Sequence, residues 1–169
     1  MSWQREICRP RVPMETINRF RVEKLRRAVS VVLTDGRRLD GDVFLAERSR
    51  VRIEPEEPID LLNEDEPFFP FFLDEQEVVL IAKSQVSRAE TAAPENSILA
   101  EMPDGAMAVE MTLVDGSAIS GFVPVEKRGE HTRLLDYLNG YAKRFIPVFW
   151  GEQVCLVNRT LIASVSQLT

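Results

Sequence analysis

A nine-residue pattern occurs twice in the chain and constrains its fold more than any other feature. Residues 33–41 read LTDGRRLDG, and 80 residues later residues 113–121 read LVDGSAISG. In both places alternating apolar and polar residues flank an Asp-Gly step, which predicts a β-hairpin with a tight turn. The last glycine of each pattern falls inside the second strand, where glycine is typical of a bulge or a bend.

The repetition extends far beyond the hairpin. Three further blocks recur in the same order, at offsets of 76 or 77 residues: DLLN (60–63) and DYLN (136–139), FFPFF (68–72) and FIPVF (145–149), VVLIAKSQVSRA (78–89) and VCLVNRTLIASV (154–165). Recurrence of four blocks in one order indicates an internal duplication of one structural unit. Each unit reads as a hairpin, a variable segment, a short helix, an aromatic strand containing proline, and a closing hairpin.

Three segments of the chain add detail to this order of elements. Residues 13–27 fit a helix and, less evenly, a strand, so the sequence leaves both open. Pro70 and Pro147 interrupt strand-like sequence, which predicts that each strand is bent or lies at a sheet edge. Across residues 134–145 apolar side chains recur at helical spacing, and we expect a helix with one apolar face there.

The duplication divides the chain into four parts, which are a basic N-terminal arm, the first unit, a linker and the second unit, at residues 1–28, 29–90, 91–105 and 106–169. A unit of this size buries its apolar residues best when its sheet curls on itself and removes its free edges. We therefore expect a mainly β protein with short helices (α+β), built as two tandem small curled β-barrels. The sequence does not decide between two separate barrels and one joined sheet.

The paired hairpins resemble a known family. The segments VVLTDGRRLDGDV (31–43) and MTLVDGSAISGFV (111–123) are similar to the first motif of the Sm-like family of small β-barrels, which are SH3-like in shape. The segments 78–89 and 154–165 are similar to that family's closing strands, and the likeness covers about half of each unit. The resemblance implies the fold. The family's RNA-contacting aromatic-Met-Asn triplet and its Arg-Gly step are absent here, so it implies RNA binding only as an alternative.

Charge is distributed unevenly along the chain. The total is −6, yet residues 1–28 carry eight basic and three acidic side chains, and residues 54–77 carry ten carboxylates with no Lys or Arg. The arm is therefore a candidate nucleic-acid or ligand site, with Arg5, Arg9, Arg11, Arg26 and Arg27 as its candidate contacts. The remaining body is acidic and repels phosphate. The acidic segment reads as a solvated loop.

Residues that carry chemistry are sparse. His131 is the only histidine, and neither Cys8 nor Cys155 has a second ligand at metal-site spacing. No glycine-rich phosphate loop is present, and the acidic segment lacks the register of a calcium loop. We expect no enzyme activity, no metal and no cofactor. Two cysteines, no signal-like apolar start and no membrane-length apolar run predict a cytoplasmic protein without membrane association.

An interaction or assembly module, with another protein or a second copy as partner, is the function that this pattern favours. The aromatic strands are either core and inter-repeat packing or exposed edges that recruit a strand. The candidate contacts are the first hairpin tip and the aromatic strands, namely Arg37, Arg38, Phe68, Phe69, Phe71, Phe72, Phe149 and Trp150. The alternatives are a Sm-like nucleic-acid-associated protein and a regulator that binds cyclic dinucleotides. The latter rests on the Arg-x-x-x-Arg of residues 5–9, which resembles the PilZ family, whose Asp/Asn-x-Ser-x-x-Gly motif is missing.

Overall fold

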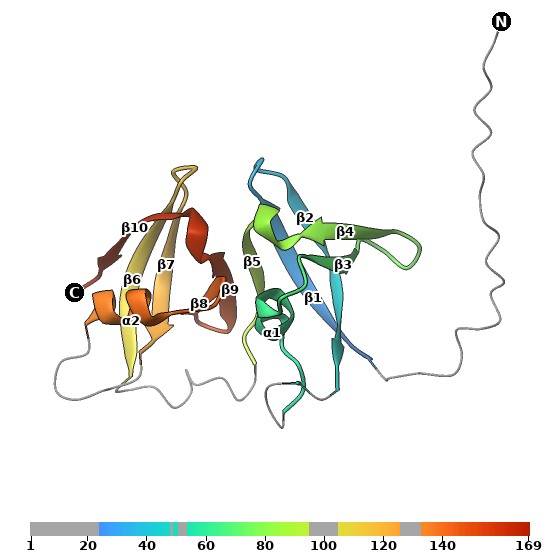
Figure 1. The fold of residues 1–169 in the computed structure, drawn as a ribbon, viewed down its shortest axis with the longest axis horizontal. Helices are drawn as coiled ribbons and strands as arrows, with labels where there is room; N and C mark the ends of the chain where they lie inside the picture. The colour runs from blue at the N-terminus through green and yellow to red at the C-terminus, as the bar shows by residue number, and fades with distance from the viewer. Residues whose placement is uncertain (1–23, 48, 51–53, 95–104, 126–132) are drawn as a thin grey trace, which may run out of the picture.

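A computed structural model describes residues 24–47, 49–50, 54–94, 105–125 and 133–169. The described residues form ten β-strands, all in one antiparallel sheet, with two short α-helices (Figure 1). Repeat one comprises β1 (Lys24–Leu33), β2 (Arg38–Ala46), α1 (Pro58–Asn63), β3 (Phe68–Phe72), β4 (Val78–Ala82), the 3-10 helix η1 (Lys83–Gln85) and β5 (Val86–Ala92). Repeat two comprises β6 (Ala106–Leu113), β7 (Ala118–Pro124), α2 (Leu134–Gly140), β8 (Phe145–Trp150), β9 (Gln153–Asn158), the 3-10 helix η3 (Arg159–Leu161) and β10 (Ile162–Gln167).

The two repeats have the same strand order. Across the sheet the strands run β10-β6-β7-β8-β9-β5-β1-β2-β3-β4. Within each repeat the last strand therefore lies beside the first, and the remaining strands follow in chain order. In Figure 1 the two repeats stand side by side, with β9 and β5 between them.

The Asp-Gly steps form the predicted hairpin turns. Gly36 and Gly116 have φ values of 88° and 84°, a region that glycine enters without steric cost. In each turn the aspartate carboxylate accepts a hydrogen bond from the backbone N–H two residues later, at 3.0 Å for Asp35 and 2.8 Å for Asp115. The hairpins β1–β2 and β6–β7 are thus confirmed.

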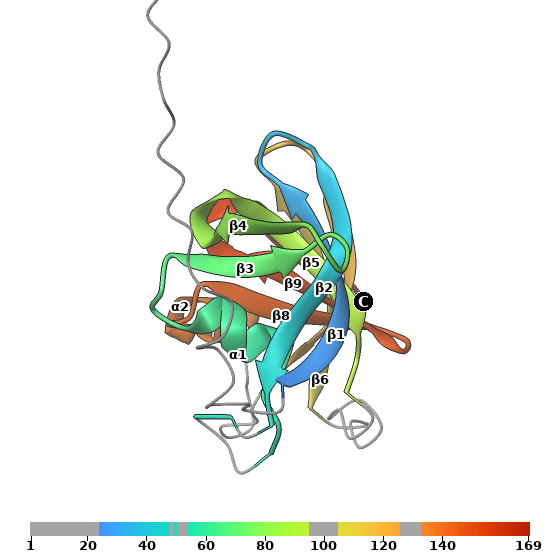
Figure 2. The same ribbon diagram turned by 90° about the vertical axis from the view of Figure 1, so that its right-hand side faces the viewer.

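The glycines inside the second strands mark where strands cross closely. β2 pairs with β3 only at Asp42 and Phe72, and β7 pairs with β8 only at Phe122 and Phe149. A Cβ placed on Gly121 would lie 2.5 Å from the carbonyl oxygen of Phe149, and one on Gly41 would collide with that of Phe72. The absence of a side chain lets β3 and β4 turn steeply across β1 and β2, as Figure 2 shows.

The expectation of two tandem barrels is wrong. Each repeat curls, but neither closes, because β5 of repeat one pairs with β9 of repeat two instead of with β4 of its own repeat. The ten strands form one open sheet whose edges are β4 and β10. A strand satisfies its backbone groups equally well within a repeat or between repeats, and the sequence pattern does not distinguish the two.

Two smaller sequence interpretations are also resolved. Residues 24–27 belong to β1, while residues 13–23 lie outside the described part of the chain. The predicted helix of repeat two ends at Gly140, and Phe145 opens strand β8 instead. Within the described residues, neither α-helix has the length and apolarity needed to cross a membrane.

The larger core cluster crosses the junction between the repeats. It joins repeat-one residues from β1 to β5 and α1 with four residues of repeat two, which are Phe145, Phe149, Val154 and Leu156. The smaller cluster contains only residues of repeat two, among them Met111, Val123 and Ile146. The core of repeat one is therefore completed by side chains that repeat two supplies.

Candidate functional site

The β5·β9 pairing is a continuous antiparallel junction between the two repeats. It extends over five residue pairs, from Arg88 opposite Val157 to Ala92 opposite Gln153. Beyond the strand ends, the buried side chain of Asn158 donates to the carbonyl of Val86 at 2.9 Å. The pairing leaves few unsatisfied backbone groups on either strand.

The apolar side chains at this junction are almost completely buried. Phe145 and Leu156 have 0% and 2% of their surface exposed. They lie in the same cluster as Leu62 of α1 and Ala89 of β5. Full burial of a Phe or Leu side chain contributes roughly 1.5–3 kcal/mol, so these contacts stabilise the joined sheet substantially.

A side-chain amide reinforces the junction. Asn63, the last residue of α1, accepts a hydrogen bond from the backbone N–H of Phe145 at 2.8 Å. The same side chain donates to the backbone carbonyl of Phe145 at 3.2 Å. Asn63 therefore fixes the start of β8 against repeat one.

Repeat one has a surface equivalent to the one that repeat two buries at the junction, but no described residue packs on it. Phe68 and Leu80 correspond to Phe145 and Leu156, yet they are 57% and 71% exposed. Val78, the equivalent of the buried Val154, is 48% exposed. We refer to Phe68, Val78 and Leu80 as the β4 edge surface. It repeats the apolar surface that repeat two buries at the junction, but at the free edge of the sheet.

The opposite end of the sheet, at β10, carries the residues equivalent to those of repeat one that pack against repeat two at the junction. Leu138 and Val165 are the equivalents of the buried Leu62 and Ala89, but both are only half-buried. Asn139, the equivalent of Asn63, is exposed, and so is Leu135. We refer to Leu135, Leu138, Asn139 and Val165 as the β10 edge surface.

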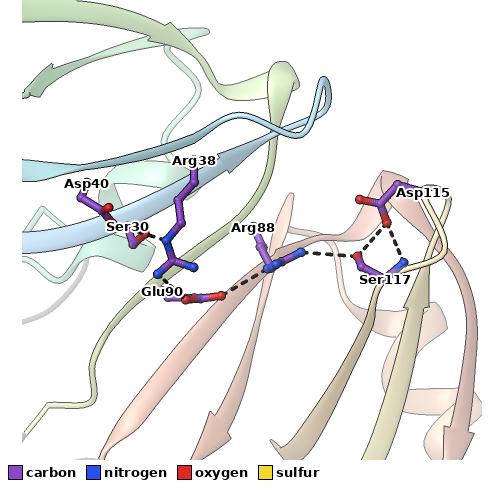
Figure 3. A network of polar contacts seen from close by, with 7 residues as sticks. All are labelled: Ser30, Arg38, Asp40, Arg88, Glu90, Asp115 and Ser117. Carbon is purple, nitrogen blue, oxygen red and sulfur yellow. Dashed lines mark hydrogen bonds and ion pairs between the residues drawn. The ribbon is translucent and has the colours of Figure 1, made fainter.

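A polar network ties the hairpins to the junction, as Figure 3 shows. Arg38 donates to Glu90 at 3.0 Å, Glu90 accepts from Arg88 at 3.2 Å, and Arg88 donates to the hydroxyl of Ser117 at 3.3 Å. The Glu90 carboxylate raises the pKa of Arg38. Ser117 in turn donates to Asp115 at 2.6 Å, a hydrogen bond that lowers the pKa of that carboxyl. Arg88 thus links repeat one to the hairpin turn of repeat two.

The predicted partner-binding residues fall into two groups. Phe69 and Phe71 point into the core of repeat one, and Phe149 lies in the junction. Arg37, Arg38, Phe68 and Trp150 are exposed, while Phe72 is half-buried against the ring of Phe44. The aromatic strand of repeat two therefore contributes to inter-repeat packing, whereas β3 of repeat one places Phe69 and Phe71 in the core and leaves Phe68 exposed beside the edge strand β4.

Only part of the basic arm is described. Arg26 lies in β1 and its guanidinium pairs with Asp42 at 2.5 Å, and Arg27 lies 4.0 Å from Glu57. Both arginines thus pair with carboxylates of the same chain. Arg5, Arg9 and Arg11 lie outside the described residues.

The acidic segment is also tied into the fold where it is described. The backbone N–H of Ala46 donates to Glu56 at 2.6 Å, and Asp74 accepts from two backbone N–H groups of its own turn. Lys83 is almost completely buried and donates to the carbonyl of Glu64 at 3.0 Å, and burial lowers the pKa of its ammonium. Among the described residues no group of three or more His, Cys, Asp or Glu could hold a metal ion. His131 and Cys8 lie outside them.

A groove beside the junction, lined mostly by repeat two and also by β5 of repeat one, was not predicted from the sequence. It has a volume of about 650 Å³ and is lined by residues that include Arg88, Phe122, Trp150, Cys155 and Leu168. Burial raises the pKa of the Cys155 thiol to about 12, so this thiol stays protonated near neutral pH and is a poor nucleophile. Repeat one has Asp42 at the position of Phe122, which removes the apolar wall there.

Two conserved features of the duplication could have been found in the sequence. Asn63 and Asn139 close the D-x-L-N block in both repeats, and a basic residue opens the 3-10 helix in both, as Lys83 and Arg159. Each basic side chain donates to a backbone carbonyl just after the helix of its repeat, at Glu64 and at Tyr141.

Comparisons of this chain with protein families, curated proteins and solved structures find no match.

Proposed function

We propose that this protein is a non-enzymatic interaction and assembly module of the cytoplasm, which binds a protein strand at its β4 edge surface. One observation carries the proposal. Phe68, Val78 and Leu80 are exposed, although the residues at the equivalent positions of repeat two are buried against a neighbouring strand and helix.

The composition of β4 supports a binding role. Free sheet edges commonly carry charges, prolines or bulges that prevent pairing with other chains. β4 reads VVLIA and has none of these features, and in the described part of the chain it pairs only with β3. An added strand would gain main-chain hydrogen bonds from β4, and side chains of the partner would cover Phe68 and Leu80.

The exposed apolar side chains of the β4 edge surface are contiguous. Exposed apolar side chains are ordinary when they are scattered, but contiguous ones mark interaction sites. Phe68 and Leu80 lie on neighbouring strands, because Phe68 pairs with Ala82 and Pro70 pairs with Leu80. Burial of each side chain would contribute roughly 1.5–3 kcal/mol to binding before entropy is counted.

Site-specific photo-crosslinking tests the proposal. A photoreactive phenylalanine analogue is placed at Leu80 in the full chain. The control carries the same analogue at Val114, which lies in the turn between β6 and β7 and is 67% exposed, compared with 71% for Leu80. Illumination of cells that produce the protein should give a discrete protein adduct from position 80 and none from position 114. From position 68, the adduct should disappear when Leu80→Lys is added. The absence of any adduct from positions 68 and 80 contradicts the proposal.

A further inference from the structure

We propose that the strand bound at β4 is β10 of a second copy of this chain, so that copies join head to tail in the manner of the internal β5·β9 junction. This inference rests on the proposed function of the β4 edge surface and names its partner. Its basis is the duplication. β4 is the equivalent of β9, β10 is the equivalent of β5, and these two strands are the free edges of the sheet.

The internal junction specifies the register of the external one. Both strands are displaced by 76 residues from their counterparts. The internal pairs Ala89–Leu156 and Glu90–Cys155 therefore translate into Val165 opposite Leu80, and Ser166 opposite Val79, of the neighbouring copy.

The apolar surfaces are complementary in this arrangement. At the internal junction, Phe145 and Leu156 share a cluster with Leu62 and Ala89. The external arrangement places Phe68 and Leu80 of one copy over Leu138 and Val165 of the next. Phe68 and Leu80 are exposed, and Leu138 and Val165 are half-buried, so all four would lose contact with water.

Two of the polar contacts have equivalents in the external arrangement, whereas that of Asn158 has none, because Ala82 occupies the equivalent position of β4. The side chain of Asn139 would form hydrogen bonds with the backbone N–H and carbonyl of Phe68 in the next copy, as Asn63 does with those of Phe145. At the hairpin tip, Ser164 of one copy occupies the position of Arg88, and Arg37 of the next copy occupies the position of Ser117. The arginine and the serine have exchanged sides, so one arginine still faces one serine.

The surfaces that meet are different, so the contact is heterologous. Contacts of this kind form a closed ring if the rotation between copies closes, and an open filament if it does not. Neither β4 (VVLIA) nor β10 (IASVSQ) contains a charged residue, and like charges therefore do not oppose their pairing. A two-fold dimer through β4 alone is not expected, because the apolar counterpart lies on β10 and α2.

The first test measures the mass of the purified full chain by light scattering and sedimentation over a wide range of concentration. We expect assemblies larger than a dimer that dissociate on dilution. Leu80→Lys should weaken association at least a hundredfold, and Asn139→Ala roughly tenfold. Leu25→Lys, at an exposed site on the interior strand β1, is the matched control and should leave the assembly unchanged.

The second test reads the register. In a Cys8→Ser and Cys155→Val background, one tagged chain carries Val79→Cys and a differently tagged chain carries Ser166→Cys. Val79→Cys reproduces the residue that repeat two has at this position, and Ser166→Cys changes only oxygen to sulfur. Paired residues on adjacent antiparallel strands lie about 4.5–5.5 Å apart, within the range of a disulfide. Mild oxidation should link the two tags, whereas Ser164→Cys, two residues away on the same strand, should link far less.

The outcomes separate this inference from the proposed function. A monomer at all concentrations, or disulfides mainly between two Val79→Cys chains, overturns pairing of β10 with β4. If the purified chain is monomeric while position 80 crosslinks to a different protein in cells, self-assembly is wrong and the strand-binding function stands. If position 80 crosslinks to nothing, both are wrong.

Discussion

The side chain of Asn63 and the backbone of Phe145 exchange two hydrogen bonds across the junction of the two repeats. The residues are separated by 82 positions in the chain, yet this contact joins the end of α1 in repeat one to the start of β8 in repeat two. The residue of repeat two that corresponds to Asn63 is Asn139, which closes the same D-x-L-N block and is exposed. The pair provides an internally controlled test of the junction.

Asn63→Ala should destabilise the folded chain by about 1–3 kcal/mol, because the N–H of the buried Phe145 loses its acceptor. Asn139→Ala should change stability by less than about 0.5 kcal/mol, since an exposed side chain is lost. Urea unfolding at low protein concentration measures both. Equal losses in the two variants would mean that the Asn63 contact does not hold the junction.

Leucine truncation at equivalent positions should give opposite results. Leu156→Ala removes a side chain with 2% exposure from the larger core cluster and should cost about 2–5 kcal/mol of unfolding free energy. Leu80→Ala removes an exposed side chain and should change it by less than about 0.5 kcal/mol. The measurement is thermal or urea unfolding in dilute solution. A large loss from Leu80→Ala would show that Leu80 is covered even in the dissociated chain.

Alanine at either crossing glycine should disrupt the fold. The new methyl group of Gly121→Ala would meet the Phe149 carbonyl at 2.5 Å and Val148 at 2.8 Å, and that of Gly41→Ala would collide with the Phe72 carbonyl. Displacement of this backbone should cost roughly 2 kcal/mol or more. Gly140→Ala is the control, because a Cβ there has no atom within 4 Å. Stability unchanged in Gly41→Ala and Gly121→Ala would refute the close crossing.

Cys155 should make stability depend on pH in alkaline solution. The thiol's ordinary pKa is 9.0, and burial raises it to about 12 in the folded chain. Below the lower value both states hold the proton, and between the two values only the folded state does. Stability therefore falls as pH rises through this window, by about 1.4 kcal/mol at pH 10 from this group.

Cys155→Val provides the comparison, because valine is the residue that repeat one has at this position. The variant should lose less stability than the natural chain between about pH 8 and about pH 10. Urea unfolding at each pH measures the two slopes. Identical slopes would indicate that the thiol ionises as readily in the folded chain as in the unfolded one.

Much of the local structure could be predicted from the sequence. The Asp-Gly steps require turns with positive φ, and Gly36 and Gly116 have it. The repeated blocks also predicted that the same elements occur twice, and β1–β5 and β6–β10 follow one strand order. These features are encoded by short-range patterns of residue type, which a single sequence displays directly.

The joining of the repeats could not be predicted in the same way. FFPFF and FIPVF have nearly the same pattern, but Phe68 is exposed and Phe145 is buried. The difference arises because repeat one lies beside β9, whereas no described strand lies beside β4. Backbone hydrogen bonds carry no residue code for the partner strand, so a barrel and a joined sheet were equally compatible with the sequence.

The β5·β9 junction joins two parts of one molecule, and this gives it a permanence that no contact between molecules has. Tethered strands meet at an effective concentration that the connecting chain sets and that the amount of protein does not change. Dilution therefore leaves this junction intact, and the smallest unit that can be exchanged between assemblies is a pair of repeats. Any assembly built from this chain must contain an even number of them.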